Sequence, residues 1–304
     1  MSKVDAPRHD PVPIGEVAQA PFAVLPDPLK IFIDRTQRLR ALAQKGDLAP
    51  YLTFLAAVTE AQYRIQDNLP EPDRPPADAV ARARDFAMPP LDRNRFTADE
   101  AFDATVARLL SLAQTLDMPP AARDALTRVT AQDAAARDAM VRALLADSVP
   151  IEALAEHVFI AAALQVHFVR LASGLDAKAL VPVGEGACPA CGGPPVASMV
   201  VGWKGAHGTR FCGCALCGTL WNVVRVKCTL CGSTKGIGYQ EVDGAPNVKA
   251  ETCEACHGYV KILQQQKDPN AEVLADDVAS LGLDLLVREK GFRRGAFNPF
   301  LLGY

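Results

Sequence analysis

The sequence predicts an α+β protein in which a mainly helical N-terminal domain is followed by two tandem metal ribbons and a C-terminal helix. Three observations lead to this fold class. Apolar residues recur at helical spacing through the first 180 residues. All nine cysteines lie between Cys188 and Cys256, among glycines and β-branched residues. Helical periodicity then returns after Cys256.

The first predicted domain, residues 1–180, contains several amphipathic helices. Apolar residues stand three and four apart in "PLKIFIDRTQRLRALA", "YLTFLAAVTEAQYRIQ", "AFDATVARLLSLAQTL" and "IEALAEHVFIAAALQVHFVRLA". The most apolar stretch, Val158 to Val169, lies between Glu156 and Arg170 and is shorter than the roughly 20 residues that span a bilayer. We therefore expect a buried helix and no membrane insertion.

The cysteine-rich region contains four CxxC motifs in tandem, which we number first to fourth. Twenty-two residues separate the first motif from the second, 21 separate the third from the fourth, and only ten separate the second from the third. The two long arms match metal ribbons at residues 181–224 and 225–265. The four motifs are Cys188 and Cys191, Cys214 and Cys217, Cys228 and Cys231, and Cys253 and Cys256.

These spacings predict two metal ions, each held by four sulfurs. A two-residue gap lets one turn direct both thiolates at one ion, and two such turns complete a tetrahedral S4 shell that suits zinc or iron. We expect the first and second motifs to form one site and the third and fourth the other. The alternative is an interleaved pairing of the four motifs. For the role of the metal, purely structural zinc is the alternative to a redox function.

Residues beside the motifs are expected to have supporting roles. Gly192, Gly218 and Gly232 follow the second cysteine of three motifs, where a positive φ suits glycine, whereas His257 takes this place in the fourth. We interpret His257 and His207 as neighbouring or exposed side chains, because four thiolates already complete each shell. Cys212 lies outside the spacing, and we interpret it as a small buried residue, with a reactive thiol as the alternative.

The last predicted segment, residues 266–304, contains a helix over 272–291 and an apolar tail. Asp276, Asp277 and Asp284 raise the question of acid–base catalysis. Because carboxylates on amphipathic helices are usually solvated, we interpret them as a charged face or a partner contact. We nominate no catalytic residue and predict that the chain is not an enzyme, since it has no dinucleotide fingerprint, P-loop or Ser/His/Asp arrangement.

The net charge and the N-terminal segment predict where the protein acts and which partners it does not bind. The net charge is −3, and residues 183–265 carry seven Lys and Arg against five Asp and Glu, a net charge of about +2 without a basic cluster. This is too little for strong phosphate-driven binding, so we expect no nucleic-acid partner. The first twenty residues contain no unbroken apolar core for export. We expect a cytoplasmic chain with reduced thiols, which favours metal over disulfides.

The last 117 residues contain the stretches "CPACGGPPVASMV", "GTLWNVVRVKCTLC", "VKAETCEACHGYVKIL", "QKDP", "ADDVASLGLD" and "NPFL", and the helical region contains "YLTFLAAVTEAQ". These stretches resemble the family of the formate dehydrogenase accessory protein FdhE. The resemblance is strongest over the last 117 residues and extends into the helical region.

The resemblance implies a cytoplasmic maturation factor that contacts the catalytic subunit of respiratory formate dehydrogenase before its export. It also implies rubredoxin-like sites that bind iron and permit electron exchange. The alternative function is a zinc-ribbon module for nucleic-acid or protein binding, with structural zinc. The sequence specifies neither the metal nor the oligomeric state.

Overall fold

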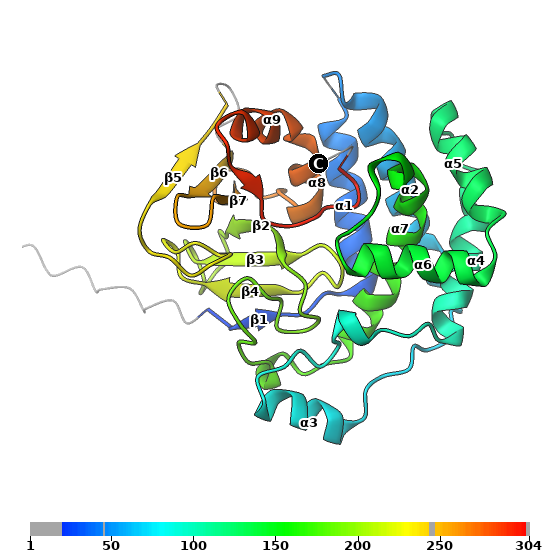
Figure 1. The fold of residues 1–304 in the computed structure, drawn as a ribbon, viewed down its shortest axis with the longest axis horizontal. Helices are drawn as coiled ribbons and strands as arrows, with labels where there is room; N and C mark the ends of the chain where they lie inside the picture. The colour runs from blue at the N-terminus through cyan, green and yellow to red at the C-terminus, as the bar shows by residue number, and fades with distance from the viewer. Residues whose placement is uncertain (1–19, 45, 243–246, 302–304) are drawn as a thin grey trace, which may run out of the picture.

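The computed structural model describes residues 20–44, 46–242 and 247–301. The segment 1–19, in which no export signal is expected, lies outside the described residues. The fold belongs to the predicted α+β class, with a group of helices beside one mixed sheet (Figure 1).

The helical part is built around α7 (Leu154–Ser173). This helix and the turn before it are long and apolar enough to cross a membrane, but 83% of their most apolar window is buried inside the protein. The prediction of a buried helix over Val158 to Val169 is therefore confirmed. The other helices of this part are α1 (Pro28–Leu42), α2 (Ala49–Arg64), α3 (Ala77–Asp85), α4 (Glu100–Ala113), α5 (Pro120–Thr130) and α6 (Ala134–Leu145).

The described residues form an eight-stranded sheet in the order β1-β4-β3-β2-β7-β6-β5, with β8 paired to β7. Two antiparallel units, β2-β3-β4 and β5-β6-β7, have the same connectivity, and the parallel pair β2 and β7 joins them. The strands are β1 (Ala23–Val24), β2 (Pro195–Val200), β3 (Arg210–Cys214), β4 (Leu220–Val223), β5 (Ile237–Gln240), β6 (Val248–Cys253), β7 (Gly258–Gln264) and β8 (Arg293–Arg294).

Two short helices, α8 (Val273–Ala279) and α9 (Leu281–Glu289), lie against one face of the sheet (Figure 1). The prediction of one continuous helix over 272–291 is therefore wrong, because the chain breaks at Ser280. The ammonium group of Lys261 on β7 accounts for the break. It donates to the carbonyl oxygens of Asp277 and Ser280, which a continuous helix would use internally.

The three aspartates of this segment are buried, so the prediction of a solvated charged face is wrong. Asp277 and Asp284 are completely buried and Asp276 is 4% exposed. Asp276 pairs with Arg38 on α1 at 2.5 Å, which links the first helix of the chain to α8. Asp284 accepts from Lys261 at 2.5 Å, and from Tyr259 and Arg294, both at 2.6 Å.

Asp277 completes a network of buried charges between the sheet and α8. It forms an ion pair with Arg294 and accepts a hydrogen bond from the amide of Asn298 at 2.7 Å. Burial alone would raise the pKa of Asp277, but Arg294 and Lys261 lower it below its usual value, so this carboxyl is charged at neutral pH. The buried charges are therefore paired, as burial requires.

Replacing Lys261 by methionine tests how much this network contributes to the stability of the fold. The change leaves Asp284 and two carbonyls without their ammonium partner, and we expect it to lower the free energy of unfolding by about 3–5 kcal/mol. Urea denaturation measures the loss. The control is Arg142→Ala, which removes an exposed ion pair with Asp138 and should cost less than about 0.5 kcal/mol. Equal midpoints for the two variants would contradict a structural role for Lys261.

Candidate metal centres

The first three CxxC motifs form tight turns closed by backbone hydrogen bonds. In the first motif the N–H of Gly192 donates to the carbonyl of Cys188, and the N–H of Cys188 donates to Gly193, both at 2.8 Å. The second and third motifs repeat both bonds. The residue after each second cysteine has a positive φ: 79° at Gly192, 71° at Gly218, 76° at Gly232 and 53° at His257. The repeat therefore specifies four similar turns, with histidine tolerating the same conformation in the fourth.

The structure brings the eight sulfurs into two groups of four, one for each pair of consecutive motifs. Within each group the sulfur atoms lie within 4.8 Å of one another. Metal–sulfur bonds of about 2.3 Å in a tetrahedral shell place the sulfurs about 3.8 Å apart. The second group has two such separations of 3.8 Å, and the first has separations of 3.4 and 3.6 Å. Both groups thus fit one S4-coordinated ion, and we refer to them as site 1 (Cys188, Cys191, Cys214, Cys217) and site 2 (Cys228, Cys231, Cys253, Cys256).

Site 1 is enclosed by the helical part of the chain. Three of its cysteines are fully buried and Cys214 is 5% exposed. The second motif inserts between α1 and α7, so that a Cβ on Gly218 would come within 2.5 Å of Ile31 on α1. Gln165 on α7 donates to the carbonyl of Ala215 at 2.8 Å. Helices far away in the sequence therefore form the wall of site 1.

The loop between α3 and α4 holds the first motif from the other side. The N–H groups of Leu91 and Arg93 donate to the carbonyls of Ala190 and Cys191, at 2.9 and 3.1 Å. The guanidinium of Arg93 is buried and also pairs with Asp147 at 2.8 Å. No local pattern in the sequence links Leu91 or Arg93 to the cysteines, so their contacts with the first motif are not predictable from the sequence.

Arg93 places a buried positive charge beside site 1. A Cβ on Gly193 would lie 3.0 Å from Nη1 of Arg93 and 3.5 and 3.6 Å from the sulfurs of Cys191 and Cys214. Only the missing side chain of glycine lets the guanidinium approach so closely. Four thiolates around a divalent ion carry a net charge of −2, so this cation offsets part of a charge that burial disfavours.

Site 2 lies at the surface. Cys228 and Cys253 are buried, whereas Cys231 is exposed and Cys256 is partly exposed. In both of its motifs, the third and the fourth, the second cysteine (Cys231 and Cys256) is the more exposed one. Leu230 supplies the inner wall, where a Cβ on Gly258 or Gly295 would come within 2.6 or 2.4 Å of its side chain. The two sites therefore share a ligand set and differ in solvent access.

The ninth cysteine and the two histidines stand outside both sulfur groups. Cys212 is fully buried on β3, opposite Ser198 and Trp221, and burial raises the pKa of its thiol to about 12. The interpretation as a small buried residue is confirmed. His257 is exposed and packs near Phe292, and His207 is exposed near Gln266. Among the residues that the structure describes, neither histidine belongs to a group of possible metal ligands.

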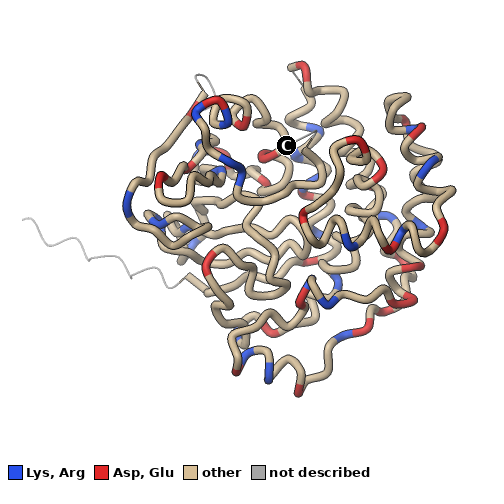
Figure 2. The backbone as a smooth tube through the Cα atoms, viewed as in Figure 1, with Lys and Arg blue, Asp and Glu red and all other residues tan. Residues whose placement is uncertain are grey.

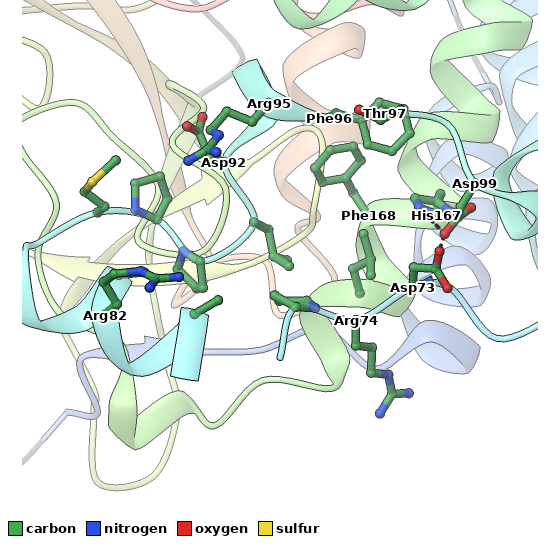
Figure 3. Close-up of a pocket in the computed structure, with 18 of the residues that line it drawn as sticks. Asp73, Arg74, Arg82, Asp92, Arg95, Phe96, Thr97, Asp99, His167 and Phe168 are labelled. Atoms are coloured by element: carbon green, nitrogen blue, oxygen red, sulfur yellow. Dashed lines mark hydrogen bonds and ion pairs between the residues drawn. The ribbon is translucent and has the colours of Figure 1, made fainter. Parts of the chain in front are cut away.

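A separate pocket of about 710 Å³ lies between α3 and the body of the molecule (Figure 3). His167 lies at its inner end, packed against Phe96 and Phe168, with Nε2 3.7 Å from Asp99. Burial lowers the pKa of His167, so the ring is neutral at neutral pH. Asp99 already caps α4 and accepts from the N–H of Asp73, so we assign these residues a packing role.

Comparison with known proteins identifies the family. Sequence models of FdhE match the chain in three consecutive parts, the N-terminal domain over residues 20–185, the central domain over 187–225 and the C-terminal domain over 226–301. The "Protein FdhE homolog" of Rhizobium meliloti (strain 1021) is 49% identical over 300 residues, covering 98% of each chain. The chain belongs to the FdhE family.

Further relatives support this membership. The "Protein FdhE homolog" of Proteus mirabilis (strain HI4320) is 36% identical over 287 residues, 92% of this chain and 91% of that protein. The crystal structure of the FdhE protein from Pseudomonas aeruginosa superposes with a TM-score of 0.82 at 31% identity, covering 92% of this chain and 99% of that one. FdhE membership supports an accessory role for formate dehydrogenase, as the resemblance implies.

The difference in solvent access predicts that this FdhE-family chain loses its two metals in separate steps. We expect two ions per chain, with the ion of site 2 released first by a chelator because Cys231 is exposed, and the ion of site 1 released only on unfolding. Metal analysis and a colorimetric chelator measure both phases. Cys231→Ser should remove the first phase, whereas the matched variant Cys191→Ser should remove the second. One ion per chain, or one common phase, would contradict this.

Burial of Cys212 predicts a thiol that does not react in the folded protein. Iodoacetamide should leave Cys212 unmodified in the metal-loaded chain and modify it after denaturation with a chelator present, because a thiol with a pKa of about 12 has little thiolate at neutral pH. Mass spectrometry of the peptide that contains Cys212 measures the reaction. Rapid alkylation of the native protein would instead favour a reactive thiol.

Proposed function

We propose that this chain is a cytoplasmic maturation factor that binds the catalytic subunit of formate dehydrogenase and is not itself an enzyme. The observation that carries the proposal is the pair of four-sulfur sites in a chain of the FdhE family. The eight cysteines of sites 1 and 2 act as the metal ligands in this proposal, and iron is the metal that we favour.

The proposed roles of the two sites follow from their surroundings. Iron held by four thiolates cycles between two oxidation states and supplies one-electron chemistry. The exposed edge of site 2 at Cys231 permits close approach of a partner, as electron exchange requires. Site 1 is enclosed by α1, α7 and the loop at Arg93, so its cysteines hold the ribbon against the helices.

The helical part serves as a scaffold in this proposal. It contributes ion pairs to the C-terminal segment through Arg35 and Arg38, which contact Glu272 at 3.0 Å and Asp276 at 2.5 Å. These pairs fix the ribbons relative to the helices, so a partner meets both as one surface.

Replacing Cys188 and Cys191 together by serine tests the accessory role. The double variant loses half the ligands of site 1 and with them the local fold, so formate dehydrogenase activity in cells should disappear while synthesis of the enzyme continues. Formate-dependent respiration and an immunoblot of the catalytic subunit measure the two quantities. Cys212→Ala is the control and should retain most of the activity.

Two outcomes would favour the alternative of a zinc ribbon with structural metal. Full respiration in the double variant is the first. The second is a purified protein that prefers nucleic acid over the enzyme subunit at physiological salt. A visible absorption spectrum of anaerobically purified protein distinguishes iron, which absorbs through its thiolate ligands, from zinc, which does not.

A further inference from the structure

A basic groove crosses the face of the sheet opposite α8 and α9. Lys261 faces these helices, so its neighbour Ile262 points to the other face, because side chains alternate along a strand. The groove has a volume of about 310 Å³ and is lined on this face by Val200, Ile262, Gln264, Lys249 and Tyr239 from β2, β7, β6 and β5. Arg225, Val226 and Lys267 form its rims.

The floor of the groove is a buried ion pair that is already satisfied. Arg210 on β3 binds Glu251 on β6 through two hydrogen bonds of 2.8 and 3.0 Å, and it also donates to the carbonyl of Arg225 at 3.2 Å. Both side chains are buried. This ion pair has a structural role. A molecule bound in the groove would therefore contact the residues above the pair.

The rims of the groove carry unpaired positive charge. Arg225 and Lys267 are exposed and form no ion pair with another described residue, whereas Lys249 pairs with Glu241 at 2.7 Å. Apart from Glu251 in the floor, whose charge Arg210 neutralises, none of the described residues that line the groove is acidic. Lys and Arg positions also gather at the end of the sheet where β5 lies (Figure 2). An occupant must therefore supply negative charge.

The groove also carries exposed apolar area. Val226 is 57% exposed and Tyr239 is 47% exposed, beside the apolar side chains of Val200 and Ile262. Aromatic residues and arginine are enriched in protein–protein contacts, and Tyr239 and Arg225 supply both residue types here. A phosphate backbone would instead require more unpaired cations than the two found here, Arg225 and Lys267.

The groove adjoins site 2. Val226 precedes Cys228 by two residues, and Lys249 and Cys253 lie on the same strand, about 13 Å apart at 3.3 Å per residue. Across the strands, β2 to β5 spans three spacings of about 4.8 Å, or about 14 Å. This length accommodates about four residues of extended chain.

We propose that this groove binds a short extended segment of the formate dehydrogenase catalytic subunit that carries acidic and apolar side chains. This inference rests on the proposed function and adds the surface that binds the catalytic subunit. The segment's carboxylates pair with Arg225 and Lys267, and its apolar side chains pack against Tyr239 and Val226. A subunit held there lies beside the exposed edge of site 2.

The double charge reversal Arg225→Glu with Lys267→Glu tests the proposal. We expect affinity for the purified catalytic subunit to fall about tenfold or more, because opposite charges are replaced by like charges at the contact. The salt dependence of binding should also weaken. Both residues are exposed, so metal content and circular dichroism should match the wild-type protein.

The matched control is Arg82→Glu with Arg95→Glu. These arginines are also exposed, form no ion pair with another described residue and line the pocket beside α3 (Figure 3). The control changes the net charge equally and should retain wild-type affinity. Loss of binding in the control with none in the groove variant would overturn the proposal.

The remaining outcomes separate this inference from the proposed function. If the wild-type protein binds the subunit and the groove variant binds equally well, the groove is not the binding site, and the proposed accessory function is unaffected. If the wild-type protein does not bind the subunit, both fail. If a single-stranded oligonucleotide displaces the subunit from the wild-type protein at physiological salt, the groove binds nucleic acid and the proposal is overturned.

Discussion

The structure depends on the parallel pairing of β2 with β7. This pairing joins two antiparallel units, each with its own pair of CxxC motifs, into one sheet. β7 also pairs with β6 and β8 and carries Lys261 on the face beneath α8 and α9. Lys261 is completely buried, which is tolerable only because Asp284 and two carbonyls surround its ammonium group. The junction of the ribbons and the packing of the C-terminal helices therefore rest on the same strand.

The features that the sequence predicts correctly are those that depend on residues close together in the chain. The four turns and the grouping of their sulfurs follow from a two-residue gap and two arms of similar length, and the positive φ of Gly192 follows from its place after Cys191. The buried charges could not be predicted in this way. The partners of Asp277 and Asp284 stand on β7 and β8, so "ADDVASLGLD" alone resembles a solvated helix face. The break at Ser280 has the same origin, since Lys261 takes the carbonyls that would continue the helix.

The predicted domain limits at residues 180, 224 and 265 remain a prediction, and contacts cross each of them. β1 pairs with β4, β2 pairs with β7, and β7 pairs with β8. The loop from Met88 to Asn94 lies between α3 and α4, yet through Leu91 and Arg93 it binds the first CxxC motif. Nothing in the composition of that loop reveals this contact, because its hydrogen bonds use backbone groups that every residue carries. Long-range backbone pairing of this kind joins segments that look independent in the sequence.

The two sites have the same local sequence pattern but lie in different environments. Both units have the same strand connectivity and the same four thiolates, so the metal chemistry available to each is alike. Site 1 differs because α1, α7 and Arg93 exclude water from it, and the guanidinium offsets the negative charge of its sulfurs. Site 2 lacks such a covering at Cys231, which is exposed to solvent. A buried site resists ligand exchange and strengthens the fold, whereas the site at the surface lies beside the groove where we propose that the partner binds.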